Sequence, residues 1–211
     1  MKPTMSEIYL QNKTNVGTIK QTNVTSNSTY HLTDNPKIFE IQRKNNFYFY
    51  VSGLTGTLDI PTNKYAEDNA DDVIKLSVSS SSVPHFTQTT ISVKRGNNEM
   101  KFAGTPSFGD GTIKLNDWIG AGTKDVLLAW QRLSYNVKTE KVGLAADYKR
   151  DAYLLEYTPD DQLVTTWVLK GCWISGLSED GFDHESNEKN VITATITYDK
   201  AYIDDDWADE E

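Results

Sequence analysis

The clearest pattern of hydrophobic and polar positions lies near the end of the chain, in residues 190–203 (NVITATITYDKAYI). Apolar residues occupy one parity and threonines the other: Ile192, Ala194, Ile196 and Tyr198 against Thr193, Thr195 and Thr197. Because successive side chains of a β-strand point to opposite faces of the sheet, this alternation predicts a strand with one buried face. Residues 37–54 start the folded region and predict an early strand, in which Phe47, Phe49 and Val51 share one face and Tyr48 and Tyr50 the other.

Residues 163–186 (LVTTWVLKGCWISGLSEDGFDHES) have the composition of a strand but do not alternate. Apolar residues fall on both parities: Trp167, Leu169, Trp173 and Leu177 on one, Val164, Val168, Cys172 and Ile174 on the other. A strand that is apolar on both faces is buried on both sides. Its second face is therefore covered either by the chain's own fold or by a neighbouring molecule.

The sequence predicts two hairpins and one helix. Residues 89–104 (TTISVKRGNNEMKFAG) place a turn that tolerates positive φ between two alternating runs, and residues 152–171 form a second hairpin around Pro159-Asp160-Asp161. The helix KDVLLAWQRLSY follows Thr123, which is a suitable N-cap. Its apolar stripe has helical spacing and consists of Val126, Ala129, Trp130 and Leu133.

The remaining folded segments add to the β content. Residues 55–72 are polar and predict a loop, and residues 73–84 (VIKLSVSSSSVP) predict a strand that ends at Pro84. A short strand is expected at 112–116, after a glycine-rich stretch. The chain is rich in Thr, Ser, Tyr and Val, which favours a mainly β fold.

Length and charge divide the chain into three expected parts. A chain of 211 residues suits one large β-rich domain, here residues 41–203, preceded by a polar arm at 1–40. The last eight residues (204–211, DDDWADEE) hold six acids, so they carry −6 of the net charge of −9. The other 203 residues carry 24 acids and 21 bases, or −3, and contain no basic stripe of the kind that binds nucleic acid.

Candidate catalytic and metal-binding residues are few. His31, His85 and His184 share no metal-ligand spacing, and Cys172 lies inside an apolar strand, where a thiol is inert. We therefore expect no enzyme activity, no metal and no cofactor. The single cysteine suits folding in a reducing cytoplasm, and the chain shows neither a secretory signal nor a membrane span.

Several motifs in the C-terminal third resemble the tail tube proteins of T4-like contractile bacteriophages. They are DYKRDAYL before the second hairpin, LKGCW in the following strand, FDHESNE in an acidic loop and TYDKAY in the last strand. The resemblance covers roughly residues 45–203 and includes the helix with Trp130. The polar arm and the acidic tail have no counterpart in it, and Ile174 stands where the family often has proline.

This resemblance implies an antiparallel β-sandwich or barrel with one flanking α-helix and a long protruding hairpin. It also implies rings of six subunits that stack into the inner tube of the virion tail, assembled in the bacterial host cytoplasm. The implied partners are other copies of the chain and the sheath, baseplate and tail terminator proteins. The tape measure protein and phage DNA would occupy the lumen without specific binding, since acidic walls repel phosphates.

Within this family, rings stack through a hairpin that residues 88–104 match. The resemblance therefore assigns inter-ring contacts to Lys94, Arg95, Gly96, Asn97, Asn98 and Glu99. It also offers a cover for the second face of the non-alternating strand, namely a neighbouring subunit. The expected inter-subunit strand faces are Val164, Val168, Cys172, Ile174, Tyr48 and Tyr50.

The acidic tail is expected to face the sheath, because weak, salt-screened charge pairs suit a surface that must first hold the sheath and then release it. Its residues are Asp204, Asp205, Asp206, Trp207, Asp209, Glu210 and Glu211. Two alternatives remain open at this point. The chain could serve as the tube of a DNA-free device, such as a tailocin or a type VI secretion system, or as a carbohydrate-binding β-sandwich module.

Overall fold

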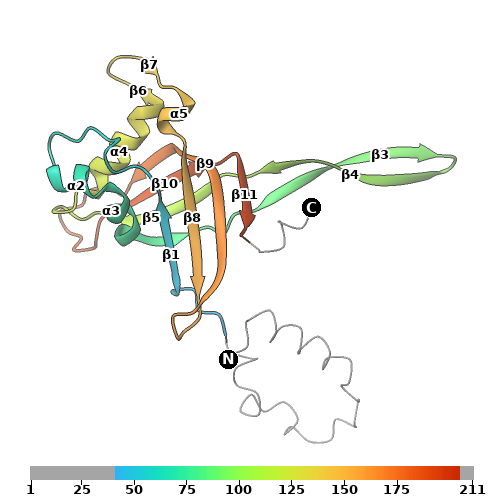
Figure 1. Cartoon of the computed structure of the whole chain (residues 1–211), viewed down its shortest axis with the longest axis horizontal. Helices are drawn as coiled ribbons and strands as arrows, with labels where there is room; N and C mark the ends of the chain where they lie inside the picture. The colour runs from blue at the N-terminus through green and yellow to red at the C-terminus, as the bar shows by residue number, and fades with distance from the viewer. Residues whose placement is uncertain (1–40, 205–211) are drawn as a thin grey trace, which may run out of the picture. The chain divides into compact units, whose positions relative to one another are not determined.

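Antiparallel strands form the body of the protein, which the computed structural model describes for residues 41–204. The body strands are β1 (Phe47–Val51), β2 (Val78–Ser81), β5 (Gly111–Asn116), β8 (Arg150–Tyr157), β9 (Leu163–Glu179), β10 (Val191–Thr197) and β11 (Lys200–Ile203). Their order is β1-β8-β9-β10-β5-β2, and β11 also pairs with β9 (Figure 1). The mainly β, antiparallel class predicted from the sequence is confirmed. The sheet has two edges, β1 and β2, so the described residues do not form a closed barrel.

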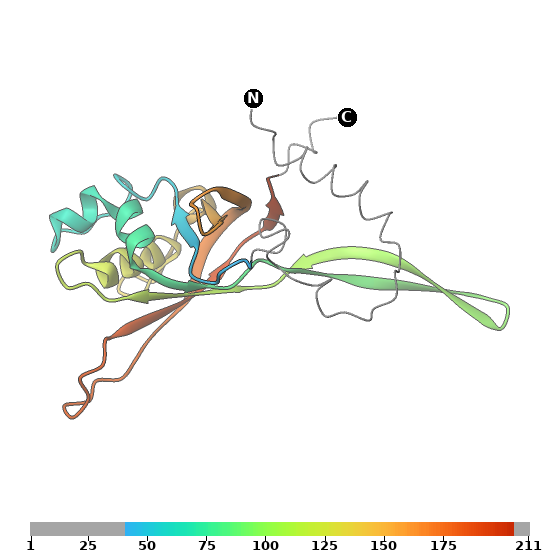
Figure 2. The same ribbon diagram turned by 90° about the horizontal axis from the view of Figure 1, so that it is seen from below.

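Two smaller ribbons leave this sheet. Strands β3 (Phe86–Arg95) and β4 (Asn98–Phe108) form the predicted long hairpin, which extends away from the body (Figure 2). Strands β6 (Tyr135–Asn136) and β7 (Lys141–Val142) form a short hairpin after the main helix.

Strand β9 belongs to both halves of the sheet. Its first half pairs with β8 and β11, and its second half pairs with β10. One register shift lies at its start, where Glu156 pairs with Thr165 but Tyr157 pairs with Leu163, and two more lie along its core-facing part. Ala152 pairs with Leu169 but Arg150 pairs with Cys172, so β9 has one extra residue there.

The second shift in the core-facing part is on the β10 side. Thr195 pairs with Gly176 but Ile196 pairs with Ile174, so β9 again has one extra residue. Each extra residue exchanges the two faces of the strand. The core-facing residues of β9 therefore change parity twice along the strand, and they are Trp167 and Leu169, then Cys172 and Ile174, then Leu177.

These bulges correct the expected role of part of β9. Cys172 and Ile174 are fully buried in the subunit's own core, so they cannot form a face toward a neighbour. Val168 is also buried, beside its register partners Tyr153 and Tyr202 on the opposite face of the sheet. The strand is apolar on both parities chiefly because each extra residue changes which positions face the core.

The first bulge contains Gly171, whose φ is +67°, a region that residues with a side chain rarely adopt. A Cβ at this position would also lie 2.3 Å from a carboxylate oxygen of Asp199, which accepts a hydrogen bond from Lys149 at 2.7 Å. We expect Gly171→Ala to lower the free energy of unfolding by about 1–2 kcal/mol. Urea unfolding of the unassembled chain measures this, with Gly181→Ala as the control because nothing lies within 4 Å of a Cβ there. An unchanged midpoint would contradict the strain at Gly171.

The helical content differs from the expectation of one flanking helix. Residues expected as a loop and the start of a strand contain α2 (Lys64–Asp68) and α3 (Ala70–Ser77). In α3, Val73, Ile74 and Ser77 are buried at helical spacing. Asp71 in its first turn accepts hydrogen bonds from the backbone N–H groups of residues 53–55 at 3.1, 2.8 and 3.1 Å. This carboxylate fixes the loop after β1 against the helix.

Helix α4 (Thr123–Ser134) is the helix predicted from the sequence, and its apolar stripe packs on the core as expected. Its N-cap is Gly122, however, and Thr123 is the first helical residue. The Thr123 side chain is buried and forms a hydrogen bond of 2.9 Å with the hydroxyl of Ser77. A final short helix, α5 (Ala145–Tyr148), precedes β8.

One core joins the helices to both halves of the sheet. It includes Phe49 of β1, Ile74 of α3, Ile113 of β5 and Trp130 of α4. In Figure 1 the helices α2, α3 and α4 lie on the side of the body away from the β3–β4 hairpin. None of the helices in the described part is long and apolar enough to cross a membrane.

Candidate assembly surfaces

The β3–β4 hairpin is a two-stranded ribbon that ends in a tight turn. Gly96 adopts a φ of +65° in the turn, which glycine tolerates without strain. Arg95 pairs with Asn98 and Lys94 with Glu99, so the six residues predicted for inter-ring contact all lie at the end of the ribbon. The structure thus brings these six together, and their role in stacking stays a prediction.

The ribbon has one apolar face. The apolar residues of this face are paired across the two strands, Ile91 with Phe102 and Val93 with Met100. Their side chains are 44–55% exposed, because the ribbon packs against no other element over most of its length. Residues Ser92, Lys94 and Lys101 lie on the opposite, polar face. This amphipathic pattern was present in the sequence, but only the structure shows that the subunit leaves the apolar face uncovered.

An isolated two-stranded hairpin is marginally stable in water, and soluble monomers rarely expose contiguous apolar patches without a function. A ribbon of this length with an apolar face therefore needs a surface that covers it. The described residues of the subunit itself do not supply one.

A second candidate surface is the outer face of the sheet formed by β1, β8, β9 and β11. Tyr50, Tyr153, Val168 and Tyr202 follow one another across these four strands. The rings of Tyr50 and Tyr153 are stacked with centroids 4.8 Å apart. Burial, followed by the neighbouring phenols of Tyr153 and Tyr157, raises the pKa of Tyr50.

Four of the six residues predicted for an inter-subunit strand face lie on this outer face. Tyr48 and Val164 are exposed, Tyr50 is half-buried and Val168 is buried. Cys172 and Ile174 differ from them, because both are buried and point into the core. The bulge at Gly171 separates Val164 and Val168 from Cys172 and Ile174 along β9, and the glycine is the one local sign of it in the sequence.

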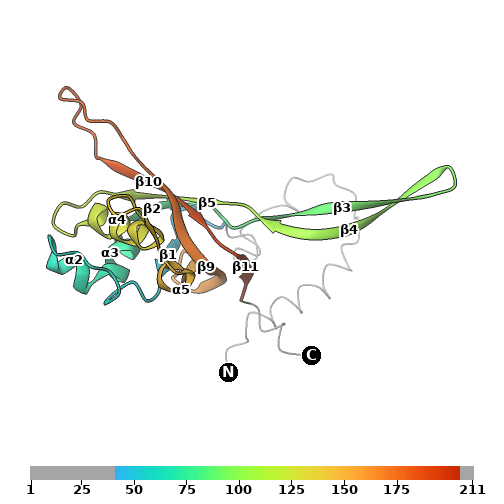
Figure 3. The same cartoon turned by 90° about the horizontal axis from the view of Figure 1, so that it is seen from above.

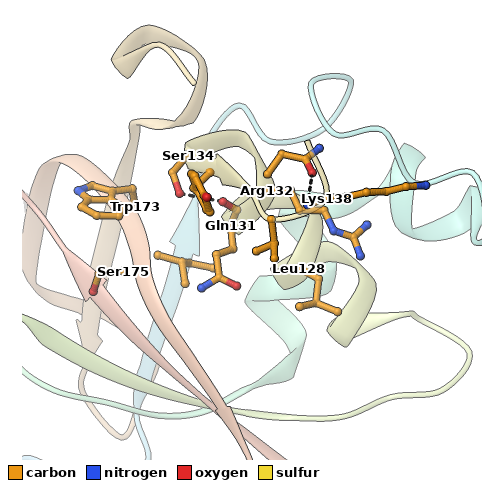
Figure 4. A pocket seen from close by; sticks show the side chains of 11 residues that line it. Leu128, Gln131, Arg132, Ser134, Lys138, Trp173 and Ser175 are labelled. Atoms are coloured by element: carbon orange, nitrogen blue, oxygen red, sulfur yellow. Dashed lines mark hydrogen bonds between the residues drawn. The ribbon is translucent and has the colours of Figure 1, made fainter. Parts of the chain in front are cut away.

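A groove of about 840 Å³ lies between the end of α4 and β9. Figure 4 shows Leu128, Gln131, Arg132 and Ser134 on the helix side and Trp173 and Ser175 on the strand side. Its lining contains no acid, histidine or cysteine. It therefore offers neither a carboxylate pair nor an imidazole for acid–base catalysis.

The described residues also give no metal site, since residues 41–204 hold no group of three or more potential ligands. Cys172 is buried, and burial raises the pKa of its thiol to about 12. A thiol of this kind is protonated and unreactive at neutral pH.

Only the start of the predicted sheath-facing tail lies in the described part of the chain. The backbone N–H of Asp204 donates a hydrogen bond of 2.8 Å to the carbonyl of Thr166, so the chain leaves β11 along the edge of β9. The other tail residues lie outside the described residues, as does the polar arm at 1–40. The tail residues outside the described part are Asp205, Asp206, Trp207, Asp209, Glu210 and Glu211.

Comparison with known proteins gives one matching family. The model of the T4-like virus tail tube protein gp19 family matches residues 45–201. No curated protein matches the sequence.

Solved structures with a similar fold come from contractile injection systems. One is the PVC sheath–tube complex of an extracellular contractile injection system in its extended state (18% identity, 85% of this chain and 97% of that chain, TM-score 0.56). A second is the PVC sheath/tube terminator (20% identity, 76% and 94%, TM-score 0.53). A third is the tube-terminating cap of the anti-feeding prophage (16% identity, 77% and 90%, TM-score 0.54). At these identities the likeness concerns the fold.

Proposed function

This chain belongs to the T4-like virus tail tube protein family and is a tail tube protein of a contractile injection system, and from this premise we propose that it assembles into rings of six. The rings stack into the hollow inner tube of a contractile phage tail. The observation that carries the proposal is the long β3–β4 ribbon, whose apolar face is uncovered in the single subunit.

Electron microscopy of the purified chain, with and without a nucleating baseplate complex, tests this function. The expected images show rings with sixfold symmetry and stacks of rings with a central channel. A chain that stays monomeric at high concentration, with no rings even when nucleated, would contradict it.

Within a ring, we assign lateral contacts to the outer face of the sheet that carries Tyr48, Tyr50 and Val164. Aromatic and aliphatic side chains on that face would be covered by the adjacent subunit. The two open sheet edges, β1 and β2, would be closed by the same assembly, which removes exposed strand edges.

Between rings, we assign the contacts to the end of the ribbon at residues 94–99. The ribbon extends far from the body (Figure 2). Most of its length takes no part in the packing of its own subunit. Its end is polar, which keeps the unassembled subunit soluble until rings stack.

The lumen would carry phage DNA and the tape measure protein without binding either of them specifically. The charge of −3 over residues 1–203 and the absence of a basic stripe from the sequence suit a wall that DNA must slide past. The role is structural, with no catalytic step, and the tube is assembled in the bacterial cytoplasm before it becomes part of the virion.

The proposed partners are the sheath, tail terminator and baseplate proteins. Structures with this fold occur in a sheath–tube complex, in a sheath/tube terminator and in the baseplate of the anti-feeding prophage. The same structures favour a second candidate, the tube of a DNA-free injection device. Sequencing of nucleic acid from purified, nuclease-treated particles distinguishes the two, since only a phage protects its genome.

We further propose the three-part division of a polar arm (1–40), a tube domain (41–203) and an acidic tail (204–211) that lies on the outside of the tube. Truncation after Ile203 should leave tube length unchanged but weaken sheath assembly, most strongly at low salt, because the lost contacts are charge pairs that salt screens in the full chain. Sheath co-sedimentation at several salt concentrations measures this. A matched variant that converts the six tail acids to amides but keeps Trp207 separates charge from the aromatic contact. Normal sheath assembly by both variants would contradict the placement.

A further inference from the structure

The body carries two neighbouring loops at the end that lies opposite the β3–β4 hairpin. One connects β9 to β10 (residues 180–190) and the other connects β5 to α4 (residues 117–122). The backbone N–H of Asp117 donates to the carbonyl of Asn190 at 3.2 Å, and the Asn190 amide donates to the Asp117 carboxylate at 3.2 Å. Figures 2 and 3 show the β9–β10 connection and the β3–β4 hairpin pointing in opposite directions from the body.

This end exposes large apolar side chains. Ile119 is 95% exposed and Phe182 is 88% exposed, and Trp118 beside Ile119 is half-exposed. Single exposed apolar residues are ordinary, but three large ones on two loops tied to each other mark a contact surface. They match in character the apolar face of the ribbon at the other end, which also has no cover.

The two ends also have opposite charge. The residues 117–120 and 180–190, here called the receiving surface, contain five acids (Asp117, Asp180, Asp183, Glu185 and Glu188) and one base (Lys189). Their sum is −5 + 1, or −4. The ribbon, residues 86–108, contains three bases (Lys94, Arg95 and Lys101) and one acid (Glu99), so its sum is +3 − 1, or +2. The ribbon is thus a basic element in an acidic chain.

We propose that the receiving surface binds the β3–β4 ribbon of a second copy of this chain in the next ring. The inference rests on the proposed stacking of rings and adds the surface on which the ribbon docks. A contact between two different surfaces of identical subunits is heterologous, so it repeats without closing on itself and builds an open stack. Opposite charges bring the correct ends together and disfavour the reversed arrangement, which would place ribbon against ribbon.

The groove beside α4 fits the ribbon less well than the receiving surface does. The groove beside α4 carries Arg132 and Lys138, whose charges would repel Lys94 and Arg95. The receiving surface differs from this groove because it combines exposed apolar side chains with an excess of acids.

Charge reversal and its rescue test the proposal. Lys94→Glu with Arg95→Glu should slow tube growth by at least about tenfold, because like charges then meet at the contact. Asp183→Lys with Glu185→Lys should do the same, and all four substitutions together should restore growth. The matched control, Lys138→Glu with Lys141→Glu, reverses two exposed lysines on the β6–β7 hairpin and should leave growth unchanged.

Disulfide trapping gives a second readout that does not depend on charge. The one native cysteine, Cys172, is buried and unreactive, so introduced thiols are the only exposed ones in residues 41–204. Tubes of Asn97→Cys with His184→Cys should give a ladder of covalent oligomers on oxidation. Asn97→Cys with Lys138→Cys should give none.

The outcomes separate this inference from the proposed function. If the wild-type chain forms no rings or tubes, both the proposed function and the docking surface are refuted. If wild-type tubes form, but both reversed pairs grow normally and the Asn97–His184 pair gives no ladder, the docking surface is overturned and the tube function stands.

Discussion

Deletion of residues 95–98 should abolish tube growth while leaving the subunit folded. The ribbon packs against no other element over most of its length, and none of its strand residues belongs to the buried core. Shortening its end therefore removes a contact between subunits without removing one within the subunit. Sedimentation and electron microscopy measure the loss of tubes, and circular dichroism with thermal melting measures the retained fold.

The matched control deletes residues 137–140, the turn of the short β6–β7 hairpin, which has the same length and is also exposed. Tubes of this control should grow normally. Tubes of ordinary length from the 95–98 deletion would contradict the assignment of the ribbon to ring stacking, whatever the control shows.

Replacement of Trp130 by alanine should lower the free energy of unfolding by about 3–5 kcal/mol, as for other large-to-small changes in a well-packed core. Trp130 is 1% exposed and lies in the core shared by α4 and the sheet. Its indole Nε1 also donates a hydrogen bond of 2.9 Å to the carbonyl of Tyr148 in α5. The substitution therefore leaves a cavity and an unpaired carbonyl.

Denaturant unfolding of the unassembled chain measures this loss. Trp130→Phe keeps most of the apolar volume but removes the donor, so it should cost about 1–2 kcal/mol. Trp118→Ala removes the same side chain from a half-exposed position and should cost less than about 1 kcal/mol. Equal losses for Trp118→Ala and Trp130→Ala would show that α4 does not anchor the core as described.

Elements with a regular pattern could be predicted from the sequence. The alternation of Ile192, Ala194 and Ile196 predicted β10 with the correct buried face, and the Gly96-Asn97 turn predicted the long hairpin. Both signals are local, because a strand's alternation and a turn's backbone conformation depend on nearby residues alone.

The helix α3 could not be recognised in the same way. Its residues VIKLS form a short apolar run followed by serines, and a run of this length fits a strand or a helix equally well. The tertiary contacts decide in favour of the helix, since Val73, Ile74 and Ser77 face the core together only at helical spacing.

The two bulges in the core-facing part of β9 explain the larger difference at the candidate site. A bulge shifts the parity of every residue that follows it, so Cys172 and Ile174 joined the outward set when the strand was read as regular. Gly171 was the one local signal of the first bulge, since a glycine within a strand often marks one. The exposure of the ribbon's apolar face could not be read from sequence, because it depends on what the rest of the subunit leaves uncovered.

A cryo-electron microscopy reconstruction of the assembled tube tests the central claim most directly. The density of residues 86–108 should cross from its own ring into the next and cover the apolar face formed by Ile91, Val93, Met100 and Phe102. Density in which the ribbon stays within its own ring, with that face open to solvent, would contradict the account.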